Sequence, residues 1–404
     1  MNGGDDSRIA ALPHLGGKTA VILFVFTLSA FVAESQLTHY VQSSLGYRQP
    51  FFLFYVVHSA FLIIFPLHLL YLALSTRTPP RPFLRGLLLA IRRHLAPQSQ
   101  SLLTGQPAQF PTFKFFRLSL GLTLGATAPG LLWFSAISLA PVSDVTAIWN
   151  TNAFFAYVIT VKLFKLGWEV RKLAAVSIAT LGVLAVIYGG SQEPDASSAG
   201  NSSLLSTKAP LTGDLLTVVA SVGYGFYQVL YKRYATLPSD LEFASSDAYT
   251  RASASGDEFS EGVFEDLLED QIDVDTVYPP PFGLHANFLT AIVGLCTFTL
   301  LSVFIPILHY SGVETFRLPP NSLVVLSIAS IAGTGVIFNA GFMILLGIWG
   351  PIIASVGNLL TIVLVFLSDI LLGGTDVITV WSLMGAGGII LAFGILVYDM
   401  SQRR

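Results

Sequence analysis

The stretch Ser322–Leu346 reads SLVVLSIASIAGTGVIFNAGFMILL and decides the class of fold. It contains no charged side chain, and it exceeds the ~20 mostly apolar residues that a helix needs to cross a bilayer. Lipid offers no hydrogen-bond partners to backbone N–H and C=O groups, so a spanning segment has to be a helix or a strand of a closed barrel. The stretch lacks the alternation of a barrel strand, and we therefore predict that it crosses a membrane as a helix.

Similar apolar runs recur along the whole chain. Of its 404 residues, 53% are hydrophobic and 11% are charged, whereas a soluble domain carries about 25% charged residues. This composition excludes an ordinary soluble enzyme, and it excludes a disordered chain, which is poor in apolar residues. We predict an all-α polytopic membrane protein with ten transmembrane helices. The predicted spans are Lys18–Thr38, Phe51–Leu74, Phe115–Leu139, Val142–Leu163, Leu173–Tyr188, Gly213–Tyr231, Leu284–Leu308, Ser322–Leu346, Ile352–Leu372 and Val377–Tyr398.

The distribution of lysine and arginine predicts the orientation of these helices, because cytosolic loops are enriched in bases. With the N-terminus in the cytosol, 18 of the 21 bases fall on the cytosolic side, and the other three are Arg48, Lys208 and Arg317. We therefore expect both termini to be cytosolic. The sequon at Asn201 falls in a predicted luminal loop, which makes Asn201 a candidate glycosylation site, although such triplets also occur by chance.

Two hydrophilic segments interrupt the spans on the predicted cytosolic side. Residues 75–112 form a basic loop, which suits the anionic headgroups of a membrane surface. Pro238–Pro281 carries twelve of the chain's 24 acidic residues and a single base, Arg251. Two interpretations fit this acidic insert. It contains either a short helix that docks on a partner or on the basic loop, or it is a solvated linker.

Charge and cysteine content limit the partners. A net charge of −3 is too small to suggest nucleic acid. The single cysteine, Cys296, excludes a disulfide framework and a cysteine-based metal site. We expect no cofactor and no metal, and we expect the lipid bilayer, a small-molecule solute and protons as partners. Small residues in the fifth and tenth spans would also allow a homodimer through these helices.

An internal repeat relates the two halves of the chain. Ala140-Pro141 precedes the fourth span and Gly350-Pro351 precedes the ninth, and each following helix carries asparagine. The first copy is residues 1–190, including the basic loop 75–112. Residues 191–212 are a luminal loop, and residues 213–404 are the second copy with the acidic insert 238–281. Five spans per copy give the copies opposite orientations, which is the plan of many secondary transporters.

Four sets of residues resemble those of a known family: Gly167-Trp168-Glu169 with Leu181-Gly182-Val183, Ser143-Asp144, Tyr224–Tyr231 with Lys232-Arg233, and Leu308–Gly312. On these residues the chain resembles the drug/metabolite transporter superfamily with EamA-type halves, and within it the F branch of solute carrier family 35. The resemblance covers roughly residues 131–399, and the second half lacks the glutamate expected after Gly374. It implies a transporter of the endomembrane system, in the Golgi or the vacuole.

Three carboxylates lie well inside predicted spans, namely Glu34, Asp144 and Asp369. Ionisable residues in a bilayer are costly and usually face a cavity or a partner. The three are therefore candidates for proton coupling, and all fall in the luminal halves of their helices. The alternative is that Asp144 caps a helix after Pro141 and that Asp369 lies in the membrane interface near a helix end.

Polar residues at helical spacing predict a substrate cavity. The sixth span places Tyr224, Tyr227 and Gln228 on one side, together with Thr217, Ser221 and Tyr231. Such a stripe lines either a cavity, where its rings could stack on a planar solute, or a hydrogen-bonded helix contact. Asp144 and Asp369 start further polar faces. The substrate-cavity candidates are Asp144, Thr151, Asn152, Tyr224, Tyr227, Gln228, Asn358 and Thr361.

The stretch Ser355–Leu359 is similar to the nucleotide-recognition stretch of fungal nucleotide-sugar transporters, in which a lysine follows the asparagine. Here Leu359 follows Asn358, so a diphosphate would lose its cation in the membrane. This argues against a nucleotide-sugar substrate, unless Lys162, Lys232 or Arg233 supplies the charge.

We therefore expect a secondary transporter of a small organic solute that is not an enzyme. One alternative is a non-transporting receptor or scaffold that acts through its acidic insert. A less favoured alternative is an intramembrane aspartyl protease, which would need the carboxyls of Asp144 and Asp369 to share a proton.

Overall fold

The computed structural model describes residues 18–95, 110–137, 139, 142–189, 210–237, 278–373 and 379–402. No residue within these ranges is in a β-strand. The helices, in chain order, are α2 (Lys18–His39), η1 (Tyr40–Ser44), α3 (Pro50–Ser59), η2 (Ala60–Ile63), α4 (Ile64–Thr76), α5 (Arg81–Leu95), α7 (Thr112–Ile137), α8 (Val142–Asn150), α9 (Asn152–Leu163), α10 (Val170–Gly189), α11 (Pro210–Leu230), η5 (Tyr231–Ala235), α14 (Leu284–Leu301), α15 (Phe304–Ser311), α16 (Ser322–Asn358), α17 (Leu360–Gly373) and α18 (Val380–Gln402).

Six helical segments within the described part of the chain are long and apolar enough to cross a membrane, and this confirms the predicted class. The remaining predicted spans coincide with the α8–α9 pair, α10 and α11. One of the six segments, Ser322–Leu364, contains the whole eighth predicted span and the first part of the ninth, which continues in α17. The number ten stays a prediction. The six segments are Ala20–Gln42, Pro50–Thr76, Thr112–Trp133, Leu284–Ser311, Ser322–Leu364 and Val380–Asp399.

Several predicted spans are not single straight helices. The fourth is divided at Thr151, where α8 ends and α9 begins. Between the eighth and ninth lies Gly350, with φ 80° and ψ 171°, directly before Pro351. Glycine adopts positive φ without steric cost, and proline removes a helical hydrogen bond. The kink therefore lies at the glycine–proline pair on which the predicted repeat depends.

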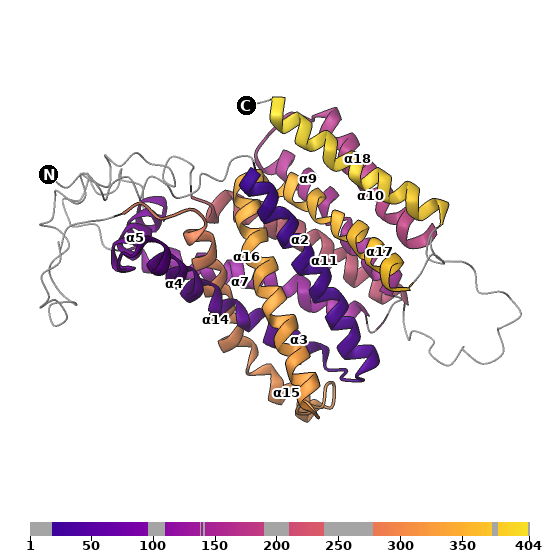
Figure 1. Cartoon of the computed structure of the whole chain (residues 1–404), viewed down its shortest axis with the longest axis horizontal. Helices are drawn as coiled ribbons and strands as arrows, with labels where there is room; N and C mark the ends of the chain where they lie inside the picture. The colour runs from indigo at the N-terminus through magenta and orange to yellow at the C-terminus, as the bar shows by residue number, and fades with distance from the viewer. Residues whose placement is uncertain are drawn as a thin grey trace, which may run out of the picture.

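Neighbouring helices approach closely where small residues meet. In Figure 1, α10 and α18 lie side by side along one edge of the bundle, and α5 lies beside α4 at the opposite end. Elsewhere α2 packs along α16, and α11 packs against α7, α8 and α9. Ala175, Ala179 and Ala392 are fully buried between α10 and α18. These small residues pack within the chain, so a homodimer through α10 and α18 would have to use their outward faces.

The helix α5 was not predicted, because its four arginines made residues 75–112 read as a basic loop. Its apolar residues nevertheless recur at helical spacing, and Phe83, Leu87 and Ile91 are buried. They pack against Leu72 of α4 and Leu284 of α14. The hydrophilic connection thus contains an amphipathic helix that is fixed to the bundle. Residues 238–277, which hold the acidic part of the insert, lie outside the described residues.

The predicted luminal ends of the helices are held together by loop contacts. The carboxylate of Glu314, beyond α15, accepts hydrogen bonds from the backbone N–H groups of Phe51 (3.0 Å) and Phe52 (3.1 Å) at the start of α3. The side-chain amide of Gln49 donates to the Thr315 carbonyl at 2.7 Å. A carboxylate at a helix N-terminus satisfies orphan N–H groups and complements the helix dipole.

We expect Glu314→Ala to lower the free energy of unfolding by about 1–2 kcal/mol, the usual cost of losing a helix cap. Thermal unfolding of the detergent-purified protein measures this loss. Glu314→Gln keeps one acceptor and should have an intermediate effect. The matched control is Arg317→Ala, since Arg317 bonds to Tyr47 and Gln49 through its backbone and its side chain is exposed. Equal stability of Glu314→Ala and Arg317→Ala would contradict the capping role.

Candidate functional site

The polar stripe of α11 faces the interior of the bundle. Thr217 and Ser221 are fully buried, and Gln228, Tyr227 and Tyr231 are exposed by 1%, 4% and 3%. A lipid-facing stripe would leave these side chains exposed. The spacing in the sequence therefore identified a buried face, whose use by a substrate stays a prediction.

Hydrogen bonds join this stripe to the break between α8 and α9. The hydroxyls of Thr151 and Ser221 lie 3.0 Å apart and share a hydrogen bond. Ser221 also lies 3.1 Å from the carbonyl of Trp149, to which the side-chain amide of Asn152 donates at 2.8 Å. Two polar side chains thus satisfy the carbonyl of Trp149 beside the helix break.

Gln228 connects three helices. Its amide nitrogen donates to Asn152 Oδ1 on α9 at 3.5 Å, a long hydrogen bond. Its amide oxygen accepts from the hydroxyl of Ser355 on α16, and this hydroxyl also contacts the carbonyl of Pro351. Asn152 belongs to the first predicted repeat, while Gln228 and Ser355 belong to the second. The network therefore crosses the interface between the predicted halves.

Aromatic rings continue along the same face. Trp149 of α8 stacks on Tyr224, with 5.0 Å between ring centroids and 29° between ring planes. Trp133 lies 6.1 Å from Trp149. Tyr224 and Tyr227 are 6.1 Å apart, and Tyr227 and Tyr231 are 6.2 Å apart. We call these five residues the aromatic ladder. It runs from α7 and α8 along α11 to the first residue of η5, and its spacings are typical of interacting aromatic pairs.

Glu34 lies next to the ladder. Its Oε2 atom is buried and has no hydrogen-bond partner among the described residues. A Cβ atom added to Gly335 of α16 would be 3.0 Å from Glu34 Oε1, so the carboxyl fills the space beside this glycine. Phe31, about one turn before Glu34 on α2, packs in the same apolar cluster as Tyr224, Tyr227 and Tyr231 of the ladder. Buried polar groups normally have partners, so the carboxyl of Glu34 is an exception, as is that of Asp214 at the start of the predicted sixth span, whose Oδ1 atom is also buried without a described partner.

For the other two predicted proton-coupling residues, Asp144 and Asp369, the structure describes the backbone only. Asp144 lies in α8 and Asp369 lies in α17, but their side chains are outside what the structure describes. The distance between their carboxyls, which an aspartyl protease would need to be short, therefore stays untested. The candidate glycosylation site Asn201 also lies outside the described residues.

Asn358 and Thr361 lie at the junction of α16 and α17. Asn358 ends α16, and its Oδ1 atom is buried without a hydrogen-bond partner in the described part of the chain. The hydroxyl of Thr361 donates to the carbonyl of Asn358 at 2.6 Å. Leu359, which occupies the position of the expected lysine, is 1% exposed in an apolar cluster.

Three bases near the predicted cytosolic end make contacts within the chain. Lys232 donates to the carbonyl of Gly347 on α16. Arg233 donates to the carbonyl of Leu163 at 2.8 Å, and the ammonium of Lys162 lies 6.0 Å from the ring of Trp168. These three contacts are made with Gly347, Leu163 and Trp168, and none of those three residues belongs to the aromatic ladder.

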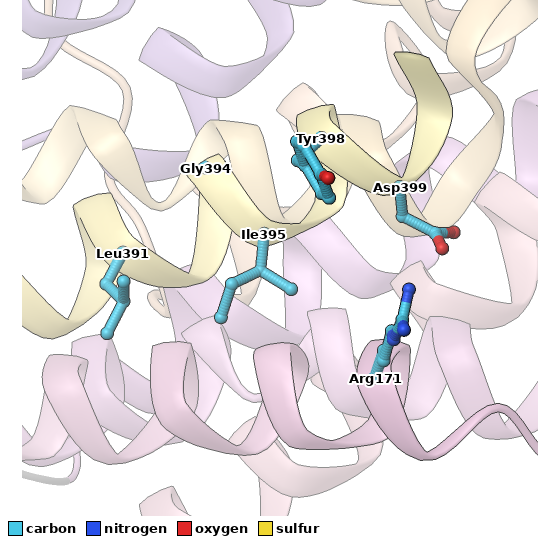
Figure 2. A pocket seen from close by; sticks show the side chains of 6 residues that line it. All are labelled: Arg171, Leu391, Gly394, Ile395, Tyr398 and Asp399. Atoms are coloured by element: carbon cyan, nitrogen blue, oxygen red, sulfur yellow. The ribbon is translucent and has the colours of Figure 1, made fainter. Parts of the chain in front are cut away.

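A separate open groove of about 700 Å³ lies on the outer side of α10 and α18. In Figure 2, Arg171 of α10 extends towards Asp399, while Leu391 and Ile395 of α18 point towards α10. Asp399 also lies 3.9 Å from the ammonium of Lys172. This groove shares no residue with the polar network or the aromatic ladder, so we do not include it in the candidate site.

Sequence reasoning missed Trp149 and Ser355. Trp149 directly precedes the polar Asn150 and Asn152, which was a usable signal for an inward-facing ring. Ser355 lies four residues after Pro351, where a hydroxyl can bond to a helix carbonyl. Its contact with Gln228 depends on how α11 crosses α16, and no pattern within one helix reveals that.

The fold is similar to that of a protein of known crystal structure. The two chains superpose with a TM-score of 0.55 and 12% sequence identity, covering 96% of this chain and 99% of the other. At this identity the similarity concerns the fold alone. No protein-family model matches the chain, and no curated protein matches it either.

Proposed function

We propose that the protein is an integral membrane secondary transporter of a small organic solute, working by alternating access between its two halves. The observation that carries this proposal is Gln228, which bridges Asn152 and Ser355 across the interface of the predicted repeats. In inverted-repeat transporters the substrate site lies near the bilayer midplane at such an interface. The proposal includes the ten predicted spans and the two predicted inverted repeats, residues 1–190 and 213–404.

Helix packing alone gives little reason for so many buried polar side chains. Interhelical hydrogen bonds in membrane proteins stabilise by only about 0.6 kcal/mol on average. Apolar side chains of similar size would pack the same helices, while Glu34 and Asn358 leave buried oxygen atoms without described partners. Groups of this kind suit a solute or a coupling ion that completes their hydrogen bonds during transport.

The aromatic ladder supports a planar solute. Trp149 and Tyr224 already stack on each other, and a flat ring could replace one of them as a stacking partner if the helices separate. A nucleotide sugar is a poor fit, because Leu359 is buried in an apolar cluster and Lys232 is bonded to Gly347. We therefore favour a planar solute without a diphosphate group.

We further propose that protons drive the transport, with Glu34, Asp144 and Asp369 as the candidate acceptors. Glu34 has the strongest structural support because its Oε2 atom is buried without a described partner and its carboxyl packs beside Gly335 of α16. The basic residues predict cytosolic termini, and the sequence resemblance favours Golgi or vacuole as the location.

Uptake into proteoliposomes tests the proposed function. The purified protein would be offered radiolabelled nucleobases, nucleosides, aromatic amino acids and aromatic amines, with and without a pH gradient. We expect at least one solute to accumulate above the level in protein-free liposomes. Gln228→Leu should reduce this uptake, whereas Thr299→Ala, an exposed site whose hydroxyl bonds only to its own helix, should not.

Failure of all these solutes with the folded protein, at either pH setting, would count against transport of planar solutes. If deletion of residues 238–277 then abolished the cellular function while Gln228→Leu left it intact, the receptor or scaffold alternative would replace the transporter.

A further inference from the structure

The helix α5 has two chemically distinct faces. Its apolar face carries Phe83 and Leu87, each 1% exposed, and packs into the bundle. On the opposite side Arg81, Arg85 and Arg92 recur at i, i+4 and i+11, which places them on one face of the helix. Arg81 and Arg85 are exposed. We call Arg81, Arg85, Arg92 and the adjacent Arg93 the arginine face of α5.

The chain that leaves the acidic segment 238–277 returns directly onto α5. The backbone N–H of Tyr278 donates to the carbonyl of Pro82 at 3.4 Å, and the rings of Tyr278 and Phe83 are 5.4 Å apart. A Cβ atom at Gly86 would be only 1.8 Å from the carbonyl oxygen of Tyr278. Glycine at position 86 is thus what allows this backbone to lie against α5.

The chain that enters the acidic segment is also held at α5. The ring nitrogen Nε2 of His94 lies 2.9 Å from the carbonyl oxygen of Tyr234 and bonds to it. Three residues later, Leu237 lines a small cavity of about 20 Å³ together with Phe282. Residues 238–277 therefore begin and end at neighbouring points, and contacts with α5 fix the chain at both.

Charge complementarity identifies the occupant of the arginine face. Residues 238–277 contain twelve acidic side chains and one base, Arg251, while α5 carries four arginines and no acidic residue. Tethering at both ends keeps the segment at an effective concentration of about millimolar beside the helix. Opposite charges at this concentration associate without a large apolar interface. We propose that the arginine face of α5 is the docking surface for the acidic segment 238–277 of the same chain.

Double electron–electron resonance, which measures the distance between two spin labels, tests this docking in nanodiscs of neutral phosphatidylcholine. The sites are Leu89→Cys beside the arginine face and Val263→Cys in the acidic segment, both in a Cys296→Ser background. We expect a narrow distance distribution at low salt. It should broaden in about 1 M NaCl, where the Debye length falls to about 3 Å. The salt titration needs no change to α5 and so does not depend on how variants fold.

Neutralising the arginine face gives the second arm. Arg85→Gln, Arg92→Gln and Arg93→Gln together should broaden the distribution at low salt. The matched control, Lys165→Gln with Arg171→Gln and Arg317→Gln, removes three exposed bases elsewhere and should leave it narrow. A broad distribution in the unaltered protein, or a narrow one that survives both salt and neutralisation, would overturn the proposal. A broad distribution combined with burial of the label at position 89 in phosphatidylserine nanodiscs would also overturn it. That result would show that the arginine face binds anionic lipid headgroups and not the acidic segment.

Discussion

Gly385→Ala should destabilise the protein by about 1–3 kcal/mol, the typical cost of overpacking a tight contact. Gly385 of α18 faces Gly182 of α10, and a Cβ atom at position 385 would be 2.4 Å from the carbonyl oxygen of Gly182 and 2.8 Å from the backbone nitrogen of Val186. Both obstacles are backbone atoms of a helix, so no side-chain rotation relieves the clash. The two helices would have to move apart along one edge of the bundle.

The control for this prediction lies on the same helix. A Cβ atom at Gly387 would meet no described atom within 4 Å, so Gly387→Ala should be neutral or should gain up to about 1 kcal/mol of helix propensity. Thermal unfolding in detergent compares the two. Gly182→Ala should resemble Gly385→Ala, and the double variant should cost less than the sum, because one displacement of the helices relieves both clashes. Equal melting temperatures for Gly385→Ala and Gly387→Ala would contradict the close approach.

Glu34→Gln should reduce solute accumulation driven by a pH gradient by at least about tenfold, within the usual 5–150-fold range of coupling between two ligands. Glutamine nearly preserves the shape of the side chain beside Gly335, but it cannot bind and release a proton. The loss should therefore fall on coupling, while exchange of labelled for unlabelled solute without a gradient should continue.

Accumulation and exchange both have to be measured, because a misfolded variant would lose both whereas a variant that lacks only proton coupling would lose accumulation alone. Ser29→Ala on the exposed side of α2 is the control and should change neither. If Glu34→Gln abolishes both exchange and accumulation, Glu34 has a structural role. If Glu34→Gln leaves accumulation unchanged, Glu34 takes no part in proton coupling. Asp144→Asn and Asp369→Asn, measured in the same way, decide which carboxyls take part.

Hydropathy predicted the membrane class correctly because lipid imposes one strong requirement on every spanning segment. The same averaging concealed local breaks. The division at Thr151 and the kink at Gly350 lie inside or between runs whose mean hydropathy is high, so their effects depend on single residues. The helix α5 was missed for the opposite reason, since its arginines masked the regular spacing of Phe83, Leu87 and Ile91.

For the candidate site, periodicity indicated which face of α11 is buried but not what that face touches. Tyr224, Tyr227 and Gln228 share a face because a helix has 3.6 residues per turn. Their contacts with Trp149, Met343 and Ser355 follow from how separate helices cross. From the sequence, Glu34 was the least favoured of the three carboxylates for proton coupling. Only the packing against Gly335 shows that it is enclosed.

The contact between Lys232 and Gly347 has a mechanical consequence. In a regular helix the N–H of residue 351 would donate to the carbonyl of residue 347, but Pro351 has no N–H. The ammonium of Lys232 contacts that same carbonyl, so a charged group from η5, which continues α11, completes a hydrogen bond that α16 cannot make itself. Separating these two helices would leave the carbonyl of Gly347 without a hydrogen bond and the ammonium of Lys232 without this acceptor. The hydrogen bond that Pro351 removes within α16 is thus replaced by one between two helices.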